Sequence, residues 1–312
     1  MTNQYQTAWE QYCETELSIV LPMLTELGYA IDPVQPHLGG ERYFMQAVTT
    51  RSGRKLILLG TRIKDGLRVV IKATSDTGGK HEIRHERLCR EVLGTIKFAY
   101  EVFLTPKEIL FLEQSAHVFA IQEFIEQERT FISRPTSEQF AFALRAFKAQ
   151  ESMHASTYEH ERLIHSTLGI IHTNDYLSSF ANFSEYVRVH SEGTSEPNSL
   201  FSLAAEFLNI HKEHIEQYTG FLTHTDFVPH NFRIRDNQIY LLDYSSLRFG
   251  NKYEGWARFA NFMALYNPEL EAALLQYVRD NRAPEEFESL QAMRVYRLGE
   301  IIRYYVGAQS RS

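Results

Sequence analysis

Three polar residues in the C-terminal half have the types and spacing that phosphoryl transfer requires. Asp226 and Asn231 lie in one loop, and Asp243 follows after a predicted hairpin. Such a reaction needs a carboxylate that positions and deprotonates the attacking hydroxyl, and oxygen ligands for the magnesium ion that bridges the phosphates. The order of the residues predicts Asp226 as the base and Asn231 and Asp243 as the metal ligands. The alternative, that they are ordinary turn and loop residues, stays open at this point.

The hairpin between Asn231 and Asp243 sets their relative positions. Arg235 and Gln238 flank a two-residue turn. The register that this turn sets places Asn231 opposite Leu242, the residue before Asp243. Strict alternation would then point the two predicted ligands to opposite faces of the hairpin. We therefore expect the chain to leave the strand ladder at this end.

A lysine and a glutamate in the N-terminal third form a second candidate pair. Lys72 lies in a strand-like run that begins at Leu67, and Glu86 follows in a predicted helix. A lysine that holds the α- and β-phosphates of ATP needs an acidic partner for its ammonium group. Glu86 adjoins the apolar stripe of its helix, so we expect it, rather than Glu82, to point inward. The alternative is a solvent-exposed lysine at the end of a strand.

The loop around Asp226 resembles the catalytic loop of the aminoglycoside phosphotransferase and choline kinase family, a branch of the protein kinase-like superfamily. His224, Asp226 and Asn231 match positions of its pattern His-Gly-Asp-x-x-x-x-Asn. The later Asp243 is followed by an aromatic residue, as in the family. The resemblance implies a two-lobed fold and transfer of the γ-phosphate of ATP, with Mg²⁺, to a hydroxyl group of a small molecule. It also implies a structural role for His224.

The sequence departs from the family pattern in several places. Thr225 and His230 stand where glycine is usual. Glu254-Gly255-Trp256 stands where the family has a further aspartate that braces the catalytic loop. These departures leave open a pseudokinase, which would bind nucleotide as a switch.

Two further segments are candidates for binding the nucleotide. The turn at Ser52 and Gly53 stands where a phosphate-covering turn is expected, and Gly39-Gly40 is its rival. The segment from Glu123 to Ile125 resembles the hinge that reads adenine through the backbone. The Glu123 carbonyl and the Ile125 amide are the expected contacts.

A His-Glu-x-x-His pattern competes as a metal site. His81, Glu82 and His85 match the motif that binds zinc from one helical face in metallopeptidases. No third ligand stands out nearby, so we expect the motif to be the exposed start of a helix, with a zinc metallopeptidase as the less favoured alternative. His211 and His214 are expected to be surface residues of another helix.

A strand-rich first third followed by a helix-rich remainder predicts an α+β protein with the bilobal protein kinase-like fold. The nucleotide-binding lobe, an antiparallel sheet with a leading helix, is expected over residues 1–125, and a mainly helical lobe with the catalytic loop and acceptor site over residues 126–312. Strands are expected over residues 42–50, 55–63, 67–74 and 116–125, with a strand pair over 231–243. Helices are expected over residues 4–28, 80–93, 137–155, 199–217 and most of 253–307.

Composition narrows the classes of function. The net charge of −7 argues against a general nucleic-acid binder, and no apolar run is long enough to span a membrane. Only two cysteines and an N-terminus without a signal-peptide pattern favour the cytoplasm. The Glu254 region and the acidic stretch from Pro284 to Glu288 would suit a cationic acceptor, such as an amino sugar or an amino alcohol.

Overall fold

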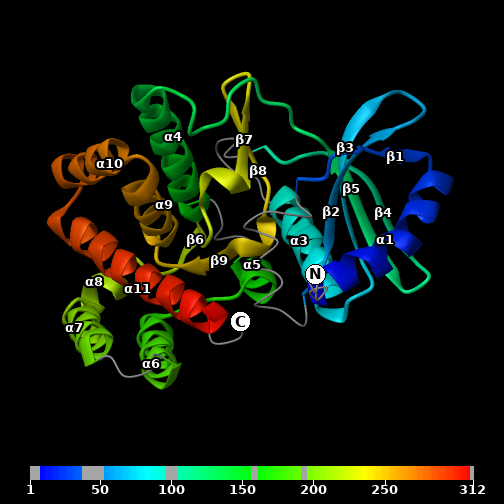
Figure 1. Ribbon diagram of the computed structural model, residues 1–312. Helices are drawn as coiled ribbons and strands as arrows, with labels where there is room; N and C mark the ends of the chain where they lie inside the picture. The colour runs from blue at the N-terminus through cyan, green and yellow to red at the C-terminus, as the bar shows by residue number, and fades with distance from the viewer. Residues whose placement is uncertain (1–7, 37–52, 96–103, 156–160, 191–194, 310–312) are drawn as a thin grey trace, which may run out of the picture. The chain divides into compact units, whose positions relative to one another are not determined.

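The computed structural model describes residues 8–36, 53–95, 104–155, 161–190 and 195–309 (Figure 1). These residues divide into two compact units. Unit 1 contains the described residues up to Arg87 together with Pro106–Ile125, and unit 2 contains those of Leu88–Thr105 and Glu126–Gly307. The chain passes from unit 1 to unit 2 after Ile125, and the described residues of Leu88–Thr105 also belong to unit 2.

Unit 1 is built on a five-stranded antiparallel sheet with the order β1-β2-β3-β5-β4. Its strands are β1 (Tyr29–Ile31), β2 (Leu56–Arg62), β3 (Leu67–Thr74), β4 (Glu108–Gln114) and β5 (His117–Glu123). Gly66, at φ +71°, lies in the turn between β2 and β3, where glycine tolerates the left-handed backbone. The sequence did not indicate β1 or β4, and the strand expected over residues 42–50 lies outside the described residues.

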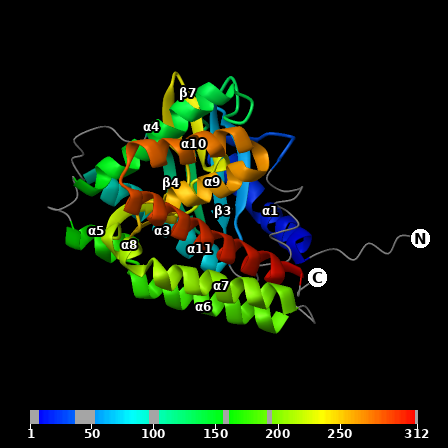
Figure 2. The ribbon, with the colours of Figure 1, turned by 90° about the vertical axis from the view of Figure 1, so that its left-hand side faces the viewer.

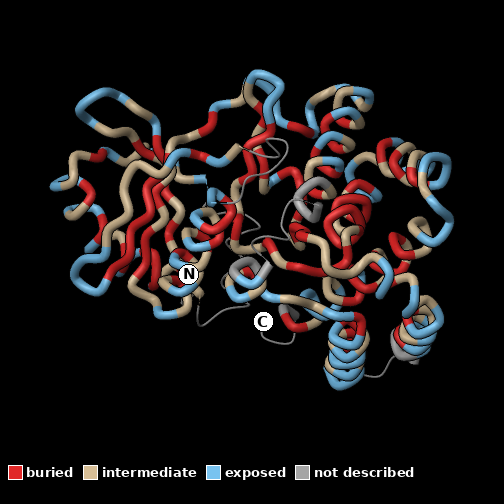
Figure 3. Tube along the Cα trace, turned by 180° about the vertical axis from the view of Figure 1, so that it is seen from behind, coloured by how far each residue is buried: buried red, intermediate tan, exposed pale blue. Residues whose placement is uncertain are grey.

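Two helices cover the sheet of unit 1. These are α1 (Ala8–Glu26) and α3 (Thr77–Thr95). Trp9 and Leu24 of α1 pack with Ile71 of β3 in one buried cluster. Successive strand residues point to opposite faces, so Lys72 points to the other face, where it contacts α3. Figure 3 shows buried and intermediate residues along this sheet, and β5 is the strand that is buried over most of its length.

Unit 2 combines two short antiparallel strand pairs with most of the helices. The strands are β6 (Phe221–His224), β7 (Phe232–Arg235), β8 (Gln238–Leu241) and β9 (Leu247–Gly250), with β6 paired to β9 and β7 to β8. The helices are α4 (Thr136–Ala155), α5 (Glu161–Leu168), α6 (Thr173–His190), α7 (Ser195–Ile210), α8 (Lys212–Gln217), α9 (Glu254–Tyr266), α10 (Pro268–Asn281) and α11 (Pro284–Gln309).

Large aromatic side chains hold the interior of unit 2 together. Phe147 of α4 stacks on Trp256 of α9 at 3.9 Å between ring centroids, and both are buried. Figure 2 shows α6 and α7 lying side by side. The single helix expected over residues 199–217 is wrong, because the chain breaks at His211 into α7 and α8. Among the described helices, none has the length and apolar character that a membrane span needs.

Candidate active site

The β7–β8 hairpin has the predicted register. Arg235 pairs with Gln238, and the two turn residues Asp236 and Asn237 have φ values of +51° and +59°. This is the backbone that a two-residue turn of type I′ requires, and Asn and Asp tolerate it better than most residues. The backbone amide of Leu242 donates to the carbonyl of Asn231 at 2.9 Å, as the register predicts.

The chain leaves the strand ladder beyond this hydrogen bond on both sides. On one side the short 3₁₀ helix η2 (Pro229–Asn231) ends at Asn231, and on the other the 3₁₀ helix η3 (Tyr244–Ser246) follows Asp243. The expected departure from strict alternation is therefore present. It removes the objection that the two side chains must point to opposite faces.

Asn231 contacts the predicted base directly. Its amide nitrogen Nδ2 donates to the backbone carbonyl and to carboxylate oxygen Oδ2 of Asp226, both at 2.8 Å. Because the amide nitrogen is used in this way, the carbonyl oxygen Oδ1 of Asn231 is left as the acceptor that a hard cation would take.

Arg258 of α9 is a contact that the sequence did not reveal. Its Nε donates to Oδ1 of Asp226 at 2.9 Å, so the two carboxylate oxygens of Asp226 have different partners. The Asp226 side chain is still 41% exposed, which leaves it accessible to a substrate. Nothing in the spacing of the chain marks Arg258, because only the packing of α9 brings it to the loop.

His224 ties the loop to Asp243. It is fully buried, and its Nε2 donates to the backbone carbonyl of Asp243 at 2.7 Å. Burial lowers the pKa of His224, although the nearby carboxylates of Asp243 and Asp226 act in the opposite direction. A neutral ring with this hydrogen bond fits the structural role that the resemblance implies.

The carboxylate of Asp243 is held by the two serines that follow it. Its Oδ1 accepts hydrogen bonds from the amide of Ser245 at 3.2 Å and from its hydroxyl at 2.5 Å, and Oδ2 accepts from the Ser246 hydroxyl at 3.0 Å. Two serines directly after an aspartate are a local capping signal that the sequence did contain. Asp243 and Asn231 Oδ1 together offer only oxygen donors, which fits magnesium.

The first turn of α9 lies where the family has the further aspartate that this sequence lacks. The amide of Gly255 donates to the hydroxyl of Thr223 at 3.2 Å. A Cβ atom at Gly255 would lie 2.9 Å from the carbonyl oxygen of His224, so only glycine fits this close approach. Helix α9 therefore packs directly on the strand that leads into the loop.

The structure corrects the expected acceptor role of Glu254. Its side chain is fully buried, accepts a hydrogen bond from Tyr176 at 2.8 Å and forms ion pairs with Arg248 and Arg297. A carboxylate enclosed by two guanidinium groups cannot contact a substrate. In the acidic stretch of α11, Glu286 is likewise engaged, by Lys252.

Unit 1 contains the predicted lysine–glutamate pair. Nζ of Lys72 donates to both carboxylate oxygens of Glu86, at 2.6 and 2.5 Å, and the side chains are 13% and 3% exposed. Glu82 instead pairs with Lys55 at 2.8 Å. The apolar stripe of the helix thus identified the correct glutamate, and Lys72 is not a solvent-exposed strand end.

The backbone hydrogen bonds of the candidate hinge define which way its groups point, and adenine binding there stays a prediction. The amide of Phe124 donates to Arg68 of β3 at 3.0 Å, and the amide of Glu123 donates the other way, to Lys107, at 2.9 Å. Backbone groups alternate in direction along an extended chain, so those of Glu123 and Ile125 point away from β3.

The candidate phosphate-covering turn is only partly described. Ser52 and the rival Gly39-Gly40 lie outside the described residues. Gly53 has φ +82°, and its amide donates to Oδ1 of Asp76 at 2.7 Å. This amide is therefore engaged within unit 1, and a role for Gly53 on a phosphate stays a prediction.

The His-Glu-x-x-His motif does not form a three-residue metal cluster in the described part of the chain. The rings of His81 and His85 stack at 6.1 Å between centroids. Glu82 forms an ion pair with Lys55. A group of three possible metal ligands does occur elsewhere in the described part of the chain, at His211, His214 and Glu288, where both histidines are partly exposed.

Comparison with known proteins rests on structure. No protein-family model matches the sequence, and no curated protein matches it. A thermostable mutant of the aminoglycoside phosphotransferase APH(4)-Ia, in a ternary complex with AMP-PNP and hygromycin B, matches with a TM-score of 0.61 at 15% identity over 94% of this chain and 95% of that one. The chain has the fold of these phosphotransferases. The predicted α+β, kinase-like fold is thereby confirmed.

Two further solved structures share this phosphotransferase fold. The macrolide 2′-phosphotransferase MphH from Brachybacterium faecium has a TM-score of 0.58 at 13% identity, with 96% of this chain and 98% of that chain covered. The streptomycin–ATP complex of APH(2″)-IIa has a TM-score of 0.54 at 18% identity, with 80% and 85% covered. The phosphotransferase fold thus extends over nearly the whole chain, although few residues are shared.

Proposed function

We propose that this protein transfers the γ-phosphate of ATP, in a magnesium-dependent reaction, to a hydroxyl group of a small molecule. The observation that carries the proposal is the joined set Asp226, Asn231 and Asp243 in a fold of phosphotransferases. The proposal is supported by the contact of Asn231 with Asp226 and by the hydrogen bond from Leu242, the residue before Asp243, to Asn231. Phosphoryl transfer demands this combination of a carboxylate base and oxygen ligands.

Each residue has a distinct task in this proposal. Asp226 accepts the proton of the attacking hydroxyl, while Arg258 and Asn231 fix the direction of its carboxylate. Lys72, held by Glu86, binds the α- and β-phosphates. Magnesium held by Asn231 and Asp243 would neutralise charge on the phosphate oxygens.

The acceptor is proposed to be a hydroxylated small molecule. Structural neighbours were solved with hygromycin B and with streptomycin, and others are macrolide phosphotransferases. Three of the carboxylates that suggested a cationic acceptor, Glu254, Glu286 and Glu288, are engaged within the protein, and the fourth, Glu285, is exposed. We therefore propose no requirement for positive charge on the acceptor.

A screen of acceptors tests the proposal. The protein is incubated with magnesium and ATP labelled at the γ-phosphate, together with aminoglycosides, macrolides and amino alcohols, and labelled products are separated. We expect a labelled product that requires magnesium and is lost in Asp226→Asn. Binding of magnesium-ATP without any labelled product across the panel would contradict transfer.

Binding of magnesium-ATP without any labelled product would favour a pseudokinase. The observation that supports this alternative is the ion pair between Arg258 and Asp226, because Arg258 occupies one carboxylate oxygen of the proposed base. A pseudokinase would show a magnesium-dependent thermal shift with ATP that is unchanged in Asp226→Asn, and no turnover.

A further inference from the structure

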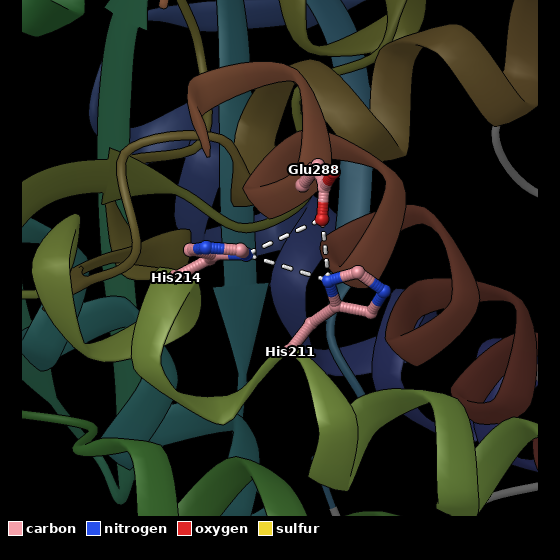
Figure 4. A group of neighbouring side chains, drawn as sticks. All are labelled: His211, His214 and Glu288. Carbon is pink, nitrogen blue, oxygen red and sulfur yellow. Dashed lines mark hydrogen bonds and ion pairs between the residues drawn. The ribbon is translucent and has the colours of Figure 1, made fainter. Parts of the chain in front are cut away.

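Two histidines and a glutamate converge in unit 2, apart from the site described above (Figure 4). His211 lies at the break between α7 and α8, His214 lies in α8, and Glu288 lies in the first part of α11. Their side chains are 16%, 31% and 44% exposed, so they are partly sheltered but open to solvent on one side. Imidazole and carboxylate are the ligand types that zinc and related metals prefer.

The three ligand atoms have the spacing of a tetrahedral metal site. Nδ1 of His211 and Nδ1 of His214 are 3.4 Å apart, and Nδ1 of His214 is 3.4 Å from Oε2 of Glu288. In a tetrahedral site with bonds of about 2.1 Å, neighbouring ligand atoms lie about 3.4 Å apart. The third separation, between His211 Nδ1 and Glu288 Oε2, is 2.8 Å and would lengthen slightly around an ion.

Proton sharing alone accounts poorly for this arrangement. A single carboxylate oxygen faces both Nδ1 atoms, and these two atoms also face each other. If both rings were protonated at Nδ1, two N–H groups would crowd together, so at least one nitrogen presents a lone pair. A cation at the centre would receive a lone pair from each of the three atoms.

A buried hydrogen-bond network fixes the backbone on both sides of the cluster. Nδ2 of Asn251 donates to the carbonyl of Ile215 at 3.0 Å and to the hydroxyl of Ser289 at 2.9 Å. Ile215 follows His214 in the chain, and Ser289 follows Glu288. Asn251, Ile215 and Ser289 are fully buried. Helices α8 and α11 are therefore held at a fixed spacing before any ion binds, which lowers the ordering cost of binding.

We propose that His211, His214 and Glu288 bind one zinc ion, or a divalent transition metal of the same class, with water in the fourth position. The bound ion joins the α7–α8 break to α11. The site is independent of the magnesium proposed at Asn231 and Asp243, because it offers nitrogen ligands that magnesium does not favour.

Zinc binding by the full-length, tag-free protein tests this site. The protein is treated with chelator, dialysed and titrated with Zn²⁺ by calorimetry, and its thermal unfolding is followed with and without the metal. We expect saturable binding of one equivalent and a rise in Tm, since a ligand bound only by the native state stabilises it. Millimolar Mg²⁺ should not compete. Affinity should fall on acidification, because metal ligands must be deprotonated.

Matched variants locate the ion. Glu288→Gln keeps the size of the side chain and should weaken zinc binding at least about tenfold, because even the loss of an outer-shell partner costs that much. His214→Ala should act likewise. Glu285→Gln, an exposed position of the same helix, and His85→Ala, in the His-Glu-x-x-His motif, should bind as the unaltered protein does.

The proposal is overturned by any of three results. These are no saturable uptake of Zn²⁺, unchanged binding in Glu288→Gln, or loss of binding in His85→Ala. Circular dichroism of each variant without metal shows whether it is folded. If His214→Ala fails to fold, Glu288→Gln decides, because the Glu288 side chain is 44% exposed and glutamine keeps its size.

Discussion

At the scale of single residues, the contacts of Asp226 define what its replacement would change. Arg258 and Asn231 each bind one oxygen of the carboxylate. They restrict its rotation, and a carboxylate held in one direction can meet a hydroxyl at a fixed angle. The loss of its charge should therefore affect the reaction more than the binding of nucleotide.

We expect Asp226→Asn to lower kcat by roughly 10² to 10⁴ while changing ATP affinity less than about tenfold, the range for a positioned acid–base group. Steady-state kinetics with an acceptor found in the screen, and calorimetry with ATP, measure the two quantities. Asp236→Asn, the same change at the hairpin turn, is the control and should behave as the unaltered protein. Equal turnover in Asp226→Asn would exclude Asp226 as the base.

Lys72→Met should reduce kcat/KM for ATP by roughly 10² or more, because it removes a preorganised charge from the transferred phosphates. Lys55→Met is the control, since Lys55 lies just before the neighbouring strand β2 and also pairs with a glutamate of α3, Glu82, at 2.8 Å. Far-ultraviolet circular dichroism should show both variants folded. If the two variants have the same activity, another lysine binds the phosphates.

The residue-level predictions from sequence succeeded where the signal was local. Glu86 was identified because the apolar stripe of a helix fixes which glutamate points inward. Arg258 could not be found, since its neighbour Asp226 is brought to it only by packing. Glu254 was misjudged because acidity in a sequence does not reveal the arginines that enclose it.

At the scale of elements, helix α9 approaches strand β6 closely near the candidate site. Gly255 approaches the carbonyl of His224 so closely that a methyl group does not fit. The same hypothetical Cβ would lie 2.9 Å from Oε1 of Gln150. A larger residue must shift either the helix or the catalytic loop.

Gly255→Ala should lower the free energy of unfolding by about 1 to 3 kcal/mol, the usual cost of overpacking. Urea unfolding measures the change. Gly94→Ala is the control, because Gly94 lies in α3 with nothing within 4 Å of its Cβ position, and alanine favours helix. A neutral Gly255→Ala together with normal turnover would show that α9 does not brace the loop tightly.

The start of α3 is anchored by Asp76. Burial opposes its charge, but the amides of Gly79 and Gly53 outweigh burial and hold the pKa of Asp76 below its ordinary value of 3.8. A depressed pKa means that the charged group stabilises the fold above pH 3.8 and loses this effect as the pH falls through its native value.

Asp76→Asn should therefore lower Tm at neutral pH, and the difference from the unaltered protein should shrink as the pH falls below about 3.8, the ordinary value of the group. Thermal unfolding followed across this pH range measures it. Asp65→Asn is a useful comparison, since Asp65 is fully exposed and pairs only locally with Arg62. A constant difference at every pH would mean that the charge of Asp76 contributes nothing.

Elements were predictable to the extent that their partners are close in sequence. The β7–β8 register followed from a two-residue turn. The pairing of β6 with β9 was missed, because Leu222 lies opposite Phe249 across a long stretch of chain. The break at His211 was missed as well, since both helices carry the same apolar periodicity.

At the scale of the whole molecule, the shared fold survives identities of 13 to 18% with its structural neighbours. Few residues are needed to specify the proposed chemistry, and many sequences can fill the same core. The fold was therefore predictable from a short loop and a change from strands to helices. The acceptor was not, because it depends on tertiary packing that no local pattern records.

ATP should raise Tm of the whole protein mainly when magnesium is present, because a ligand that binds the native state stabilises it by mass action. Asp243→Asn should remove the magnesium-dependent part of the shift. Differential scanning fluorimetry with ATP, with and without Mg²⁺, measures both. Asp236→Asn, at the far end of the same hairpin, should keep the full shift, and an unchanged shift in Asp243→Asn would remove Asp243 from the metal site.

The β7–β8 hairpin also limits which natural sequence variants keep its register. Its turn has only two residues. The length of this turn sets the register of every cross-strand pair, from Arg235–Gln238 to the hydrogen bond between Asn231 and Leu242. One inserted or deleted residue at the exposed turn would shift the whole ladder by one step and reverse its faces. Natural variants should therefore keep Asn, Asp or Gly at positions 236 and 237 and exclude changes of length there, although the turn lies at the opposite end of the hairpin from Asp243.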